Sequence, residues 1–136
     1  MPDPKGSLTA AQYEIMAVIW AAGDAGITIA DIWQAIAEAR TIGRTTVLNQ
    51  VDRLEKRGWL KRLPGDGPTR FRATLSKEDA SQQLVAGFVS DYFQGSTADL
   101  VSALLGSEAC ALTKKEVDRL RKLLEQARRR REEGQP

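Results

Sequence analysis

The segment R-T-T-V-L-N-Q-V-D-R-L-E-K-R-G-W-L-K-R, residues 44–62, decides the fold of this chain. Its aliphatic residues Val47, Val51 and Leu54 recur at the spacing of one helical face, and the other side is polar and basic. Gly58 follows and permits the left-handed backbone that ends many helices. The pattern predicts a helix that starts at residue 44, ends before Gly58, and has one apolar side and one basic side.

Two other helices are predicted before this one. Thr9 and Gln12 form a capping-box pair at the start of an amphipathic stretch over residues 9–22. Thr28 is placed to cap a second helix over residues 29–39. Aromatic residues at helical spacing usually pack in a core, and we expect this of the three tryptophans: Trp20, Trp33 and Trp59.

A β-hairpin is predicted directly after the basic helix. Residues 59–63 and 69–74 alternate in polarity, and P-G-D-G-P at residues 64–68 is a dense turn signal between them. Three helices followed by a basic hairpin is the order of a winged helix-turn-helix, whose third helix enters the major groove of DNA. The fold class expected is therefore mainly α with a small β-hairpin.

The rest of the chain is predicted to be helical. Ser76 opens a long helix, Gly95 ends it, and Thr113 with Glu116 forms a capping box for the last helix. The expected domains are a disordered N-terminus at 1–7, a winged-helix DNA-binding domain at 8–75, a helical dimerisation domain at 76–127, and a charged flexible tail at 128–136.

Charge is segregated along the chain. Residues 8–39 hold four acidic residues and no lysine or arginine, whereas residues 40–72 hold nine basic residues against three acidic ones. A contiguous basic third is suited to a polyanion such as DNA. The alternative is an ordinary amphipathic helix with a solvated outer side.

The basic helix supplies most of the predicted DNA contacts. Free N–H groups and a partial positive charge at its start would let Arg44, Thr45 and Thr46 meet phosphate and base edges. Asn49 and Arg53 follow on the same side, and these residue types pair bidentately with adenine and guanine.

The hairpin supplies the remaining predicted DNA contacts. Arg70 and Arg72 flank Phe71, so both guanidinium groups share one face of the strand and the ring takes the other. Lys61 and Arg62 are adjacent, so at most one of them supports the same contact.

Several classes of function are excluded by composition. The chain has one cysteine, Cys110, and no histidine, so neither an internal disulfide nor a structural zinc site is expected. No cofactor motif, phosphate-binding loop or nucleophile elbow is present, which argues against an enzyme. No run of about 18 apolar residues occurs, and the opening M-P-D-P-K-G-S lacks a signal-peptide core. A cytoplasmic protein without a membrane partner is expected.

The stretches L-T-A-A-Q-Y-E-I-M-A-V-I-W (8–20), 44–62 and F-R-A-T-L-S-K-E-D-A (71–80) resemble the penicillinase-repressor family of BlaI/MecI type. The resemblance implies a DNA-binding domain, a C-terminal helical domain that makes a homodimer, and repression by occupying a palindromic operator in double-stranded DNA. The contacts carried over by the resemblance are Arg44, Thr45, Thr46, Asn49 and Arg70.

The sequence departs from that family in ways that bear on regulation. Antibiotic-sensing members are released by cleavage at an Asn-Phe bond, where this chain has Ala103-Leu104. Gly43 and Ile42 stand where many members have Ser and Trp. Copper-sensing relatives carry Cys-x-Cys motifs, which this chain lacks. A signalling protease and a small-molecule inducer both remain open as partners.

Two apolar rows in the C-terminal helices are the predicted dimer contacts: Leu84, Phe88 and Tyr92, and Val117, Leu120 and Leu124. A single reading helix covers too few base pairs for the usual margin over non-specific DNA, which favours a dimer. The alternative is that both rows fill a core within one chain. Two further functions stay open: direct control by a small ligand, and a protein–protein adaptor on a winged-helix scaffold.

Overall fold

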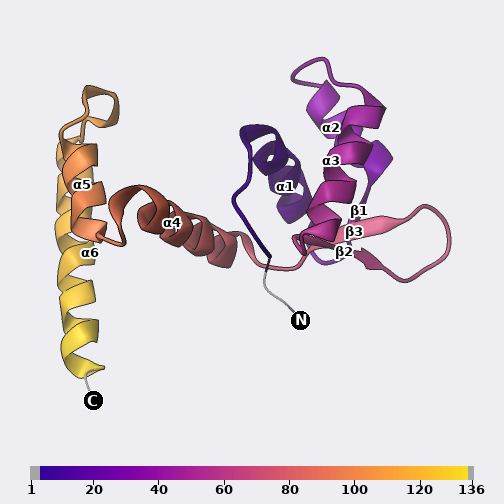
Figure 1. Cartoon of the computed structure of the whole chain (residues 1–136). Coiled ribbons are helices and arrows are strands. Elements are labelled where there is room, and N and C mark those ends of the chain that lie inside the picture. The colour runs from indigo at the N-terminus through magenta and orange to yellow at the C-terminus, as the bar shows by residue number, and fades with distance from the viewer. Residues whose placement is uncertain (1–3, 135–136) are drawn as a thin grey trace. The chain divides into compact units, whose positions relative to one another are not determined.

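The computed structural model describes residues 4–134. The chain divides into two compact units, of which the first ends at Phe88 and the second begins at Val89 (Figure 1).

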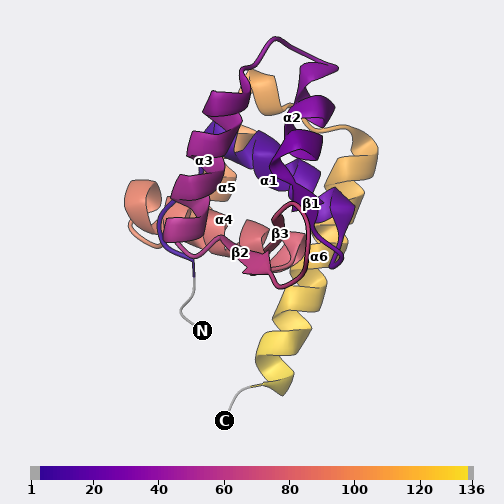
Figure 2. The same cartoon turned by 90° about the vertical axis from the view of Figure 1, so that its right-hand side faces the viewer.

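The first unit is a three-helix bundle with a small antiparallel sheet. Its elements are α1 (Ala10–Ala22), β1 (Ile27–Thr28), α2 (Ile29–Ala37), α3 (Arg44–Lys56), β2 (Leu60–Leu63) and β3 (Arg70–Ala73). The strand order is β1-β3-β2. The helices lie together on one side of the sheet, and the β2–β3 loop projects away from them (Figures 1 and 2). This is the winged helix-turn-helix predicted from the sequence.

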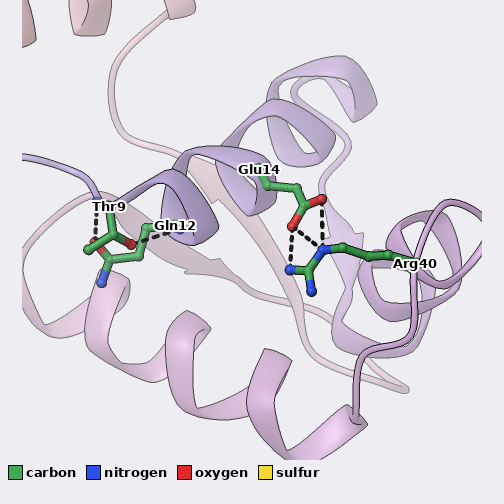
Figure 3. Close-up of polar contacts among 4 residues, drawn as sticks. All are labelled: Thr9, Gln12, Glu14 and Arg40. Carbon is green, nitrogen blue, oxygen red and sulfur yellow. Dashed lines mark hydrogen bonds and ion pairs between the residues drawn. The ribbon is translucent and has the colours of Figure 1, made fainter.

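Local signals place the ends of these helices where the sequence predicted. The Thr9 hydroxyl accepts a hydrogen bond from the Gln12 amide while the Gln12 side chain accepts one from the Thr9 amide, which completes a capping box (Figure 3). Thr28 caps α2 with a single hydrogen bond, which its hydroxyl accepts from the Asp31 amide. After α3, Gly58 takes a φ of 85°, which ordinary residues rarely adopt.

An ion pair joins α1 to the connection between α2 and α3. Arg40, which lies in that connection, donates to the Glu14 carboxylate with a shortest N···O distance of 2.6 Å (Figure 3). Hydrogen bonds from Arg40 lower the pKa of Glu14 below its usual value. The pair therefore links α1 to the turn that leads into α3.

The core of the first unit is built from the faces predicted to be apolar. Val47, Val51 and Leu54 of α3 are buried against α1, α2 and the sheet. Trp59 is also buried, with 1 % of its surface exposed, as expected. Trp20 and Trp33 are only half-buried and pack at the edge of the core.

The segment before α1 is held against the end of α3. The Lys5 amide donates to the Arg57 carbonyl at 3.1 Å, and the Arg57 guanidinium donates in return to the carbonyls of Lys5 and Ser7. The sequence predicted disorder over 1–7, and residues 4–7 do not follow that prediction; residues 1–3 lie outside the described part. The partners of Arg57 lie about fifty positions earlier in the chain, so no local pattern in the sequence predicts them.

The first unit also includes the start of α4 (Lys77–Phe93). Ala80 is fully buried in the core and Leu84 packs against it. The boundary between compact units therefore lies after Phe88, whereas the sequence predicted it after residue 75. Leu84, expected in the dimer contact, is partly used by the first unit.

The second unit contains the end of α4, then α5 (Thr97–Leu105), a 3₁₀ turn at Glu108–Cys110, and α6 (Lys114–Glu133). Thr113 and Glu116 form the predicted capping box. This helix continues to Glu133, into the region predicted to be a flexible tail at 128–136, of which residues 135–136 lie outside the described part. Arginine and glutamate favour helices, and the pairs Arg128–Glu132 and Glu125–Arg129 lie one turn apart at 3.3 and 3.5 Å. Within residues 4–134, none of the helices combines the length and the apolar character needed to cross a membrane.

Candidate nucleic-acid interface

The exposed side of α3 carries the polar residues predicted to read DNA. Thr45, Thr46, Asn49 and Arg53 are all exposed, whereas Val47 and Val51 between them are buried. The structure therefore brings these four side chains onto the solvent side of one helix. Leu48 is exposed beside them and adds an apolar spot.

The start of α3 is electropositive and has no side-chain cap. Gly43 occupies the N-cap position and makes no side-chain hydrogen bond, and no acidic residue lies in the first turn. By contrast, α1 and α2 are capped by Thr9 and Thr28. Uncapped N–H groups together with the helix dipole make this terminus suited to a phosphate group.

Arg44 is held at this terminus by a tryptophan of α2. Its guanidinium carbon lies 4.6 Å from the centroid of the Trp33 ring. The Trp33 indole N–H donates to the Ile42 carbonyl at 2.7 Å, which fixes the ring. The sequence predicted Trp33 as a core residue only. Its position under Arg44 depends on the turn between α2 and α3, which no local pattern specifies.

The basic residues of α3 differ in their ion pairs. Lys56 pairs with Asp52 at 3.0 Å. Among the described residues, no carboxylate pairs with Arg44 or Arg53. Their charges are therefore the ones on this helix that remain available to an anion.

The hairpin register determines which arginines face α3. Arg62 lies opposite Phe71, and the two share the face that is turned to the core. Arg62 lies 5.5 Å from the Phe71 ring centroid and pairs with Glu55 of α3 at 2.8 Å. This pair raises the pKa of the guanidinium, which stays charged. The sequence left open which of Lys61 and Arg62 supports the wing contact, and only the register distinguishes the two.

Arg70 and Arg72 lie on the other face of β3, as their alternation with Phe71 predicted. Arg70 is exposed and donates to the Gly26 carbonyl at 3.2 Å. Arg72 is half-buried and donates to Asp24 at 3.4 Å. Both predicted wing residues therefore have partners in the turn after α1, and Arg72 is the less accessible of the two.

The sequence of this chain matches one known protein family. The sequence profile of the penicillinase repressor family matches residues 8–126. The chain belongs to the penicillinase repressor family. It is therefore a DNA-binding transcriptional repressor and not an enzyme, and the resemblance found in the sequence is confirmed.

The chain is also similar to solved structures of MarR and MepR. The oxidised form of MarR from E. coli is 26 % identical, with 88 % of this chain and 75 % of that chain covered and a TM-score of 0.47. A MarR mutant from E. coli complexed with operator DNA is 25 % identical, with the same coverage and TM-score. A MepR mutant from S. aureus bound to an oligodeoxyribonucleotide is 21 % identical, with 88 % and 77 % covered and a TM-score of 0.48. No curated protein matches the sequence significantly.

Proposed function

We propose that this repressor binds a palindromic operator as a homodimer, with α3 of each subunit in the major groove. The observation that carries the proposal is the start of α3, where an uncapped helix terminus, an ion-pair-free Arg44 and exposed Thr45 and Thr46 meet. Phosphate contacts at this end would set the register, and side chains farther along would read bases. Such a protein acts where the chromosome is, so we propose a cytoplasmic location.

The reading residues have separate roles in this proposal. Asn49 is suited to adenine and Arg53 to guanine, because each residue type presents a bidentate pattern that matches that base. Thr45 and Thr46 contribute hydroxyl groups next to the free backbone N–H groups. Arg44 approaches phosphate or guanine from the position fixed by Trp33.

The wing would bind the DNA backbone through Arg70, and through Arg72 once its ion pair with Asp24 is given up. A phosphate contact is not sequence-specific and releases a counterion. Arg70→Ala should therefore weaken binding to all duplexes alike and lower the slope of log K against log salt by about 1. Titrations at several salt concentrations measure that slope, and an unchanged slope would remove Arg70 from the interface.

The homodimer is proposed from the apolar surface of α5, α6 and the segment between them. Seven large apolar side chains there are exposed in the single chain: Val101, Leu104, Leu105, Leu112, Leu120, Leu123 and Leu124. Apolar residues at such density on one small unit are typical of an interface. A second copy is the occupant proposed, because a dimer supplies the second reading helix that an operator requires. In addition to these seven residues, Val117, Phe88 and Tyr92 remain predicted contacts of the dimer.

The test of the function is specific binding to promoter DNA. Fluorescence anisotropy compares the duplex upstream of the protein's own gene with a scrambled duplex at about 0.15 M salt, where non-specific binding is weak. Saturable nanomolar binding to the first duplex alone is expected. Equal micromolar binding to both would contradict recognition of this promoter, and Asn49→Ala gives the matched variant with an altered reading face.

A further inference from the structure

A cavity of about 550 Å³ lies in the first unit, on the face of β3 that carries Arg72. It is bounded by the end of α1, by β3, and by the segment that leads from the wing into α4. Its volume is within the range of small-molecule sites, which is about 300–1,000 Å³. Trp20, Asp24, Arg72, Leu75 and Lys77 are among its lining residues.

Arg72 is the polar group of this cavity whose bonding is incomplete. Its side chain is 33 % exposed, and its Nη1 donates to Asp24 over a long 3.4 Å, while the Asp24 side chain is 98 % exposed. Its Nε is buried and has no hydrogen-bond partner among the described residues. A guanidinium is matched by a planar carboxylate that accepts two parallel hydrogen bonds. The enclosed Nε is out of reach of a ligand, so the donor that Arg72 offers beside the cavity is the Nη1 group held only by the long contact to Asp24.

The rest of the lining is suited to an apolar body. The Trp20 indole N–H already donates to the Leu75 carbonyl at 3.0 Å, so the ring offers apolar surface rather than a donor. Ala17 and Ala21 present only methyl groups from α1. Lys77 adds a second cation, and Asp24 and Glu78 are the acidic residues at the rim.

We propose that this cavity binds a small carboxylate with an apolar, preferably aromatic, body, and that the ligand weakens DNA binding. The carboxylate replaces Asp24 on Arg72, and the body lies against Trp20. The effect on DNA rests on the proposed function. The ligand should lower the affinity for DNA, because it brings an anion to the strand that carries Arg70 and occupies Arg72 itself. Coupling between two sites is reciprocal, so operator DNA must weaken the ligand by the same factor.

The binding step is tested without DNA, using 2-naphthoate as the probe and the uncharged 2-naphthamide as its control. Amide and indole NMR signals are followed during titration, with the Trp20 indole assigned from Trp20→Phe. Saturable shifts at Trp20 and at residues 73–78, with the Trp33 indole unmoved, are expected for naphthoate. Arg72→Gln should weaken the probe at least tenfold and Arg70→Gln should not. Equal shifts with the amide, or no effect of Arg72→Gln, would overturn the site.

The regulatory step is tested by adding 2-naphthoate to the operator complex. Loss of DNA affinity is expected in the wild type and is expected to vanish in Ala21→Leu, which fills the cavity without changing charge. Binding of naphthoate with no change in DNA affinity would overturn the regulation while leaving the site. Failure of the protein to bind any promoter duplex would instead contradict the proposed function, and the NMR result would still decide the site.

Discussion

The two units of the chain differ in where their apolar side chains lie. In the first unit, every residue of the core cluster between Ile15 and Ala80 is buried by the chain itself. In the second, α5 and α6 bury none of their side chains, although both carry leucines at helical spacing. The first unit thus supports its own reading helix. The second exposes apolar side chains, and in the proposed homodimer a second copy covers them.

The largest effect is expected from truncation inside the first unit. Leu54→Ala leaves a cavity beneath α3, because the side chain is fully buried, and should lower the free energy of unfolding by about 2–5 kcal/mol. Urea denaturation followed by circular dichroism measures this loss. Leu48→Ala on the same helix is the control, since Leu48 is 49 % exposed, and a similar loss in both variants would contradict the assigned core.

A large effect on assembly is expected from truncation inside the second unit. Leu124 is 65 % exposed in the single chain. If a second copy buries Leu124, the substitution Leu124→Ala lowers the free energy of dimerisation by about 1.5–3 kcal/mol per side chain. The dimer dissociation constant should then rise at least about tenfold. Sedimentation equilibrium measures that constant. Lys122→Ala, on the other side of α6, should leave it unchanged; a wild-type monomer at micromolar concentration would contradict the dimer.

A smaller effect is expected where Trp33 holds Arg44. Trp33→Leu keeps an apolar side chain but removes the ring, and a partly exposed cation–π contact contributes about 0.5–1 kcal/mol. Operator affinity should fall about two- to fivefold. In an Arg44→Ala background the same substitution should have no further effect. Additive losses in this double-mutant cycle would show that Trp33 acts through the stability of α2 instead.

Local signals in the sequence predicted most of the fold. Thr9 with Gln12 and Thr113 with Glu116 close capping boxes at the helix starts expected, and Gly58 ends α3 with a positive φ. The buried face of α3 also follows the aliphatic spacing. These signals act within one or two turns, so they can be recognised without any knowledge of the tertiary fold.

Contacts between distant segments were not predictable in this way. Arg57 binds carbonyls about fifty positions earlier in the chain, and Arg72 pairs with Asp24 rather than standing free for DNA. Trp33 under Arg44 is a third case. Each is set by packing of whole elements. Phe88 and Tyr92, predicted for the dimer contact, are exposed in the single chain, and their role in a dimer stays a prediction.

The smallest effect is expected at the ion pair between Glu14 and Arg40. The pKa of Glu14 is lowered in the folded state by hydrogen bonds from Arg40, so the pair stabilises the fold above the unfolded carboxyl pKa of about 4.3. That contribution is lost as pH falls through the lowered folded value. Arg40→Ala should therefore lower the free energy of unfolding at pH 7 but not at low pH, where Glu14 is protonated. The loss at pH 7 should be small, because an exposed ion pair contributes little.

Thermal unfolding of wild type and Arg40→Ala across that pH range measures the difference. Glu14→Gln is the matched control and should cost the same as Arg40→Ala at neutral pH. A difference between wild type and Arg40→Ala that does not shrink on acidification would show that Arg40 stabilises the turn before α3 without Glu14.

Hydroxyl-radical footprinting of the repressor on its promoter tests most directly whether two reading helices act together. The account predicts two protected patches of related, inverted sequence, with centres one helical turn or about 34 Å apart, and a ratio of two chains per duplex. Leu124→Ala should lose both patches together. A single protected patch occupied by one chain would contradict the assignment of the second unit to dimerisation.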